Sequence, residues 1–168
     1  NYQKLQGVGI RDQSEQVNQA WYRSAEYIFR GMLDELSLDK EKNRLLEFGY
    51  GTGFYTKLIN SLGFKNYLGV DIVDTHIKHI TNDLSHFTGD FQKADIGTQK
   101  VEFKDASLIF SIDMTQHIVN DDKFRYFLKE NVRKTYRKMA SSSLPTPLKI
   151  KNMLFTKFPE VLFLMKKP

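Results

Sequence analysis

The chain has 168 residues and no cysteine, and 40% of its residues are hydrophobic, 27% charged and 13% aromatic. This length predicts one domain, the aromatic content excludes general disorder, and the lack of cysteine excludes a disulfide scaffold, a thiolate nucleophile and a cysteine-based zinc site. No apolar run approaches the roughly 20 residues that cross a bilayer, and no secretory signal is visible, so we expect a cytoplasmic protein with no membrane partner.

The net charge of +5 is unevenly distributed along the chain. Residues 1–120 contain 13 Lys and Arg against 16 Asp and Glu, whereas residues 121–168 contain 12 against 4. A basic segment can bind an acidic partner such as nucleic acid. Because no aromatic residues are interleaved with these charges in a known nucleic-acid motif, a solvated helix face and tail is the favoured interpretation.

The first elements alternate between helix and strand. Residues 14–36 are predicted as an amphipathic helix, since their apolar side chains recur at three- and four-residue spacing. This helix carries Trp21, Tyr22 and Phe29, and either packs on a sheet or caps a ligand pocket. A buried strand is predicted at 45–48, followed by a helix over 55–62 that Gly63 ends.

The alternation then repeats. Strands are predicted at 67–70, 91–94 and 106–112, with a helix at 74–86, capped by Asp74, and another at 121–138 whose acidic start and basic end suit the helix dipole. The fold class is therefore α/β: a doubly wound, mostly parallel sheet with helices on both faces, in three α/β/α layers.

The pattern changes after the last helix. Residues 139–149 are a turn-rich linker, and residues 149–156 and 160–166 are predicted to form an antiparallel hairpin at Phe158-Pro159. We expect one domain over 1–168, with a helical cap at 1–38, a core at 40–138, a C-terminal hairpin at 149–168, and a gap or shortening near 139–149.

A glycine-rich loop stands where the first strand turns into a helix. Gly49, Gly51 and Gly53 allow a ligand to approach the backbone closely, and the helix start offers free N–H groups. A dinucleotide fingerprint would need its third glycine at position 54, which is Phe54. The glycines alone are a weak signal, because a tight turn explains them equally well.

Acidic residues near successive strand ends strengthen this signal. Glu47 precedes the glycines, Asp71 follows the second strand, and Asp95 follows the third. A carboxylate after the second strand can accept hydrogen bonds from both hydroxyls of a ribose. A carboxylate after the third strand can accept one from an adenine amino group. For any one of them a surface or capping role is the simpler explanation, but the set indicates a nucleoside site at the switch point of the sheet.

With these motifs in order, the chain resembles the class I S-adenosylmethionine-dependent methyltransferases over roughly residues 40–135. The resemblance implies that the cofactor is S-adenosylmethionine and the product S-adenosylhomocysteine. It also implies the residues that bind the cofactor, which are Glu47, Gly49, Tyr50, Gly51, Gly53, Asp71, Ile72, Asp95, Ile96, Ile112 and Asp113. Among them, the glycine loop would contact the methionine part, Asp71 the ribose, and Asp95 and Ile96 the adenine.

The resemblance has one departure, because the family's fifth strand and a further helix are missing before the final hairpin. Three explanations remain: a shortened domain, a strand contributed differently, or a stretch absent from the printed chain. The last is favoured, since an uncovered edge on the fourth strand would be hydrophobic. The family also implies a seven-stranded sheet with its last strand antiparallel.

Candidate catalytic residues follow the fourth strand. His117, whose side-chain type has an ordinary pKa near 6.5, and Asp113 could act as a general base, although the favoured interpretation of His117 is a histidine that packs under the next helix and hydrogen-bonds the loop. His76, His79, Asp83 and His86 share one side of a helix, but a solvent-facing stripe explains them, so no metal is expected.

Methyl transfer to an O or N atom of a small-molecule acceptor by in-line displacement is the favoured function. The alternatives are an RNA or protein methyltransferase that uses the basic C-terminal surface, or a module that binds the cofactor without catalysis. A dinucleotide-dependent oxidoreductase comes last, given the misplaced third glycine.

Overall fold

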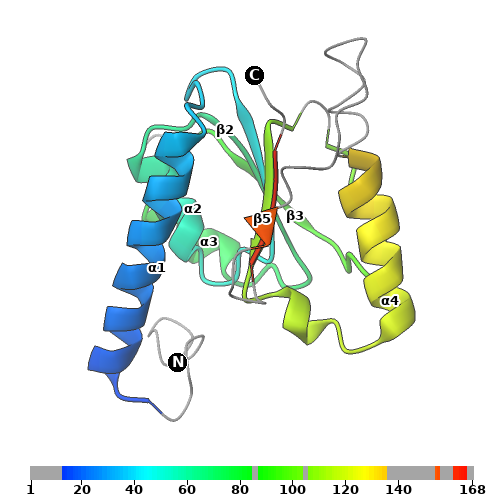
Figure 1. Ribbon diagram of the computed structural model, residues 1–168. Helices are drawn as coiled ribbons and strands as arrows, with labels where there is room; N and C mark the ends of the chain where they lie inside the picture. The colour runs from blue at the N-terminus through cyan, green and yellow to red at the C-terminus, as the bar shows by residue number, and fades with distance from the viewer. Residues whose placement is uncertain (1–12, 85–86, 104–105, 136–153, 156–160, 166–168) are drawn as a thin grey trace.

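The computed structural model describes residues 13–84, 87–103, 106–135, 154–155 and 161–165. Its sheet has the strand order β3-β2-β1-β4-β6-β5, with β1 to β4 parallel. Figure 1 shows the sheet between two helical layers, with α1 on one side and α4 on the other. The predicted three-layer α/β/α architecture is confirmed. The six strands of the described residues are one fewer than the family resemblance implied.

The parallel strands lie close to the predicted positions. They are β1 (Arg44–Phe48), β2 (Asn66–Asp71), β3 (Asp90–Lys93) and β4 (Leu108–Ile112). Successive side chains alternate between faces, so Leu46 and Phe48 of β1 lie in one core cluster and Leu45 in another. Leu45 and Leu46 are completely buried, as expected for a strand covered on both faces.

One face of the sheet is covered by α1 (Glu15–Glu35) and α2 (Phe54–Ser61). The side chain of Ser14 caps α1 by accepting a hydrogen bond from the Val17 N–H, at 3.3 Å. Phe29 packs against Phe110 of β4, with ring centroids 5.2 Å apart. Of the two alternatives for this helix, packing on the sheet is confirmed at Phe29, while a role as a cap over a ligand pocket stays a prediction.

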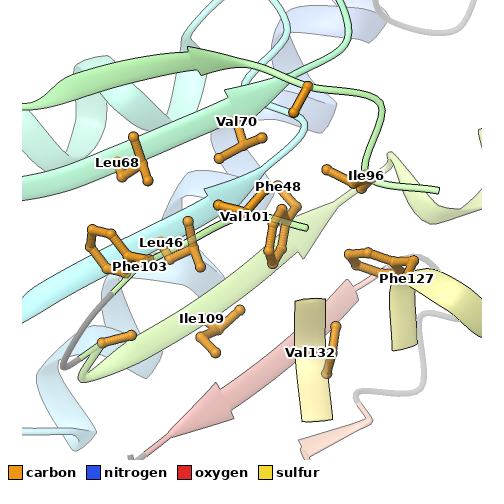
Figure 2. Packing of buried hydrophobic residues seen from close by; sticks show 12 residues of the cluster. Leu46, Phe48, Leu68, Val70, Ile96, Val101, Phe103, Ile109, Phe127 and Val132 are labelled. Atoms are coloured by element: carbon orange, nitrogen blue, oxygen red, sulfur yellow. The ribbon is translucent and has the colours of Figure 1, made fainter. Parts of the chain in front are cut away.

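The opposite face is covered by the helical segment that follows β4. Figure 2 shows Phe127 and Val132 of this segment directed toward the sheet. Phe127 contacts Phe48 of β1 edge-on, with ring centroids 5.2 Å apart. The core cluster that contains Phe48, Phe127 and Val132 covers this face of the sheet below the carboxyl ends of β1, β2 and β4, where the candidate site lies.

Two helices differ from their predictions. The helix α3 (Ile77–Asn82) is shorter than the predicted 74–86, and Asp74 does not cap it, because its carboxylate pairs instead with Lys93 Nζ at 3.1 Å. Of the helix predicted at 121–138, the described residues are α-helical over α4 (Asp121–Tyr126), continue as the π-helix η3 (Phe127–Arg133) and return to α-helix at 134–135, while 136–138 lie outside the described residues. The spacing of apolar residues in the sequence does not distinguish a regular α-helix from one that contains a π-helical segment.

The C-terminal hairpin falls mostly outside the described residues. Of it, β6 (Val161–Met165) pairs antiparallel with β4, and β5 (Leu154–Phe155) pairs antiparallel with β6. The turn at Phe158-Pro159 and the linker at 139–149 lie outside the described residues, so both stay predictions. The edge of β4 is paired with β6, and the expected gap or shortening near 139–149 stays a prediction.

Candidate functional site

A cleft of about 320 Å³ opens at the carboxyl ends of the parallel strands. Its walls come from the start of the glycine loop, from the segments after β2 and β3, and from the segment between β4 and α4. The residues that line it are Gly49, Val70, Asp71, Ile72, Ala94, Asp95, Ile96, Met114, His117, Ile118, Val119, Asn120 and Lys123. Six of the residues predicted as site residues are thus brought together, and Ile72 and Val119 present exposed apolar side chains there.

All three glycines of the loop adopt positive φ: +85° at Gly49, +51° at Gly51 and +81° at Gly53. A Cβ at Gly49 would lie 2.4 Å from Met114 Cγ, and one at Gly53 would lie 2.7 Å from Ile80 Cγ1. A Cβ at Gly51 would meet nothing within 4 Å. Packing therefore explains two of the glycines, whereas the backbone at Gly51 faces open space.

Asp71 joins the glycine loop to the end of β2. Its Oδ2 accepts a hydrogen bond from the Gly51 N–H at 3.0 Å, and its Oδ1 accepts one from the Val73 N–H at 3.0 Å. Tyr50 supports the same turn, because its hydroxyl donates to the Val73 carbonyl at 2.8 Å. The carboxylate is thereby fixed at the wall of the cleft, and each oxygen keeps a lone pair for a ligand.

Asp95 forms an ion pair with a cation from another element, a pairing that the sequence pattern did not indicate. Its Oδ2 accepts from Lys123 Nζ at 2.8 Å, and its Oδ1 accepts from the Gly97 N–H at 3.0 Å. The ammonium of Lys123 holds the pKa of the Asp95 carboxyl below its ordinary value. Asp95 is therefore ionised and oriented at neutral pH, as a carboxylate acceptor needs to be.

Glu47 lies on the other face of the sheet and is not among the cleft residues. It is 2% exposed, and its Oε2 accepts hydrogen bonds from the Tyr67 hydroxyl at 2.5 Å and the Thr56 hydroxyl at 3.4 Å. Burial raises the pKa of the Glu47 carboxyl to about 8. This cluster links β1, α2 and β2.

We expect stability to depend on pH through Glu47. The folded state holds the carboxyl proton up to about pH 8, while the unfolded chain releases it near its ordinary pKa of about 4.3. Between these values the unfolded state binds fewer protons, so the free energy of unfolding falls as pH rises, by up to about 1.4 kcal/mol per pH unit. Above about pH 8 both the folded and the unfolded state have released this proton, so the contribution of Glu47 is fully lost and the free energy of unfolding no longer changes through this group.

The variant Glu47→Gln removes the titration and keeps an oxygen that accepts from Tyr67. Urea unfolding at pH 5.5, 7 and 8.5 should therefore give a flatter pH dependence than the wild type, with the variant gaining relative stability at the highest pH. Identical slopes for the two proteins would contradict the burial argument. Glu41→Gln, at an exposed glutamate, is the matched control and should leave the slope unchanged.

A second group of residues lies near the end of β4 on the α1 side. Asp113 has a φ of +55°, an unusual value for a residue other than glycine. Burial raises the pKa of Tyr22 and of Tyr55, and the negative charge of Asp113 raises both further. The Tyr22 ring packs 4.6 Å from the Phe54 ring at the start of α2. Asp113 and Ile112 thus lie beside a cluster of neutral phenols rather than in the cleft wall.

His117 and its neighbours complete the wall. His117 ends the 3₁₀ helix η2 (Thr115–His117), is exposed, and lines the cleft together with Ile118. Asn120 caps α4 by accepting from the Lys123 N–H at 3.0 Å, which places the Lys123 side chain near Asp95. Sequence reasoning missed Lys123, whose only signal was its place in the first turn of a predicted helix.

In the described parts of the chain, no three His, Asp or Glu side chains are grouped as a metal ion would require. His86, one of the histidines considered above, lies outside the described residues. No helix among the described residues is both long and apolar enough to cross a membrane.

The fold and the cleft together define a class of protein. A doubly wound sheet with a glycine loop after β1, and a cleft where the strand order reverses between β1 and β4, is a Rossmann-like nucleotide-binding domain. The family model described as a methyltransferase domain matches residues 45–136. The chain therefore belongs to the class I, Rossmann-like methyltransferase family.

Solved structures agree with this fold. An S-adenosylmethionine-dependent methyltransferase from Clostridium acetobutylicum is 21% identical with a TM-score of 0.57, and the match covers 68% of this chain and 46% of that one. A TehB-like SAM-dependent methyltransferase from Corynebacterium glutamicum is 14% identical with a TM-score of 0.51, and the match covers 88% of this chain and 100% of that one. This chain thus spans less than half of the Clostridium protein. No curated protein matches it.

Proposed function

We propose that the chain is a single methyltransferase domain that binds S-adenosylmethionine in the cleft and transfers its methyl group to a small-molecule acceptor. The observation that carries the proposal is the fixed carboxylate of Asp71, held by two backbone N–H groups at the wall of a largely apolar cleft. A carboxylate in this position suits the two hydroxyls of a ribose. Family membership and the fold of the two solved structures support the same cofactor.

The residues of the cleft fit such a ligand chemically. Ile72 and Val119 offer exposed apolar surface for a flat purine ring, and Asp95 offers an ionised acceptor for its amino group. The open space at Gly51 allows a methionine carboxylate or amino group to approach the loop backbone. The cleft volume of about 320 Å³ lies at the lower end of the range for small-molecule sites, about 300–1,000 Å³.

The cofactor supplies a methyl group on a sulfonium when it is bound, so the chain has to orient rather than activate the donor. Asp71 and the glycine loop would fix the ribose and methionine portions, while Ile96 and Asp95 would hold the adenine. Alignment of donor and acceptor in a site that excludes water then supplies much of the rate. His117 is our candidate for a general base toward a hydroxyl acceptor, and Asp113 is the second candidate.

The acceptor would enter from the α1 side of the site. There the buried rings of Tyr22 and Tyr55 pack against Phe54 near Asp113, and the two tyrosine hydroxyls remain neutral at physiological pH because burial raises their pKa. Aromatic surroundings with a few polar groups suit a small organic molecule better than a nucleic-acid backbone, which would require a basic wall.

Titration calorimetry tests the cofactor assignment. The wild-type chain should bind S-adenosylhomocysteine with a micromolar Kd and should not bind NADH, because position 54 is Phe54 rather than the third glycine of a dinucleotide fingerprint. Binding of NADH without S-adenosylhomocysteine would contradict the proposal. RNA binding that weakens steeply with salt would contradict the small-molecule acceptor while leaving the cofactor assignment intact.

A further inference from the structure

The loop that follows β3 forms part of the wall of the cleft. It begins with Asp95 and Ile96, which both line the cleft. It closes on itself, because the N–H groups of Thr98 and Gln99 donate to the Asp95 carbonyl at 2.9 and 2.7 Å, and the Asp95 N–H donates to Gln99 Oε1 at 2.7 Å. The orientation of the Asp95 carboxylate therefore depends on the shape of this loop.

Asn131 holds the loop from inside the protein. It is 0% exposed, and its Nδ2 donates to the carbonyls of Ile96 and Gln99 at 2.8 and 2.9 Å. Its Oδ1 accepts from the Val101 N–H at 2.7 Å. Both amide hydrogens and the amide oxygen are thus used on the backbone of one loop.

The π-helix explains how this side chain reaches the loop. In a π-helix hydrogen bonds run from i to i+5, so residues four and five positions after Phe127 lie on the same side as Phe127. Asn131 and Val132 occupy these positions, and all three residues are buried. In a regular α-helix, at about 100° per residue, Val132 would be turned about 140° from Phe127, so the three residues could not all lie on the buried side.

The same helical segment also reaches Asp95 from the solvent side. Lys123 of α4 pairs with the Asp95 carboxylate at 2.8 Å, and a Cβ at Gly97 would lie 2.8 Å from Lys123 Cβ. Lys123 is partly exposed, so its contact is adjustable. Asn131 makes its contacts in the core, where unpaired backbone groups are costly, and it is therefore the fixed support of the loop.

We infer that Asn131 is a positioning residue for adenine recognition: the π-helix aims its amide at the backbone of residues 96–101 and so fixes the Asp95 carboxylate that accepts from the adenine amino group. This inference rests on the proposed function, since it assumes that the cleft takes a nucleoside. It predicts that changes at Asn131 alter selectivity for the base, and not only affinity or stability.

A pair of ligands separates selectivity from affinity. S-inosylhomocysteine carries a carbonyl oxygen where S-adenosylhomocysteine carries the adenine amino group, so it cannot donate to Asp95 from that position. The wild type should bind S-adenosylhomocysteine at least about tenfold more tightly, the equivalent of one hydrogen bond to a charged group. In Asn131→Asp, which keeps the shape but loses donors to two carbonyls, the ratio of the two Kd values should approach one.

Val132→Ala is the matched control, because it removes buried packing from the same π-helix without touching a hydrogen bond of the loop. It should keep the wild-type ratio even where both affinities fall. If Asn131→Asp kept the wild-type ratio of the two Kd values, the positioning role of Asn131 would be wrong and the proposed function would be unaffected. A wild-type chain that binds neither ligand would instead contradict the proposed function.

A second measurement needs no variant and remains decisive if Asn131→Asp does not fold. Hydrogen exchange of the Val101 N–H, which donates to Asn131 Oδ1, should slow more with saturating S-adenosylhomocysteine than with saturating S-inosylhomocysteine. The amide of Leu46, in the core strand β1 and not among the residues that line the cleft, serves as the reference for general stabilisation by a ligand. Equal slowing at Val101 with both ligands would overturn the inference.

Discussion

Replacing Asp71 with alanine should weaken the binding of S-adenosylhomocysteine by roughly a hundredfold or more. The carboxylate would lose hydrogen bonds to two ribose hydroxyls, each about 1.5–3 kcal/mol for a charged acceptor, and about 1.4 kcal/mol corresponds to a tenfold change in Kd. The variant also leaves the N–H groups of Gly51 and Val73 without their acceptor, which loosens the glycine loop. Titration calorimetry at fixed pH and salt measures the effect.

Asp74→Ala is the matched control for this experiment. Asp74 is an exposed carboxylate shortly after β2, but it pairs with Lys93 and is not among the residues that line the cleft. Its loss should leave Kd within about twofold of the wild type, as for a typical exposed ion pair. If Asp71→Ala and Asp74→Ala gave the same small change, the ribose role of Asp71 would be wrong.

Gly53→Ala should destabilise the fold more than Gly51→Ala, the substitution at the loop glycine that faces open space. An L residue at φ +81° costs about 1–2 kcal/mol, and the new Cβ would overlap the buried Ile80, with overpacking adding about 1–3 kcal/mol. The sum is a large fraction of the roughly 5–15 kcal/mol that stabilises a domain. The midpoint of urea unfolding reports it.

Gly51→Ala is the control, because it changes the backbone preference without a steric clash. Its new Cβ would have no neighbour within 4 Å, so only the cost of the positive φ remains. Gly51→Ala should therefore unfold at a urea concentration between those of the wild type and Gly53→Ala. Equal midpoints for the two variants would show that Ile80 does not determine the cost.

Most of the fold was predictable because it depends on local pattern. Continuous apolar runs predicted the buried parallel strands, and Gly63 correctly ended α2, since its φ of +85° requires a residue without a Cβ penalty. The cap at Asp74 failed because its carboxylate is used by Lys93, nineteen residues later in the chain. Pairing at this separation leaves no trace in a local pattern.

The candidate site was predictable as a set of strand ends, but not in its supporting contacts. Asp71 and Asp95 do face one cleft, as parallel topology requires. Strand alternation places Glu47 on the face of Leu45, but its partners Thr56 and Tyr67 come from α2 and β2 and leave no trace in the pattern of the strand itself. The partners Lys123 and Asn131 come from a helical segment whose π geometry depends on tertiary packing.

We expect the cleft to bind the adenosine part of the cofactor through Asp71 and the loop after β3. A crystal structure of the chain with S-adenosylhomocysteine tests it most directly. We expect the ribose hydroxyls within hydrogen-bonding distance of the Asp71 carboxylate and the adenine beside Ile72 and Ile96, with its amino group on Asp95. A ligand bound elsewhere, or with its ribose away from Asp71, would contradict the account.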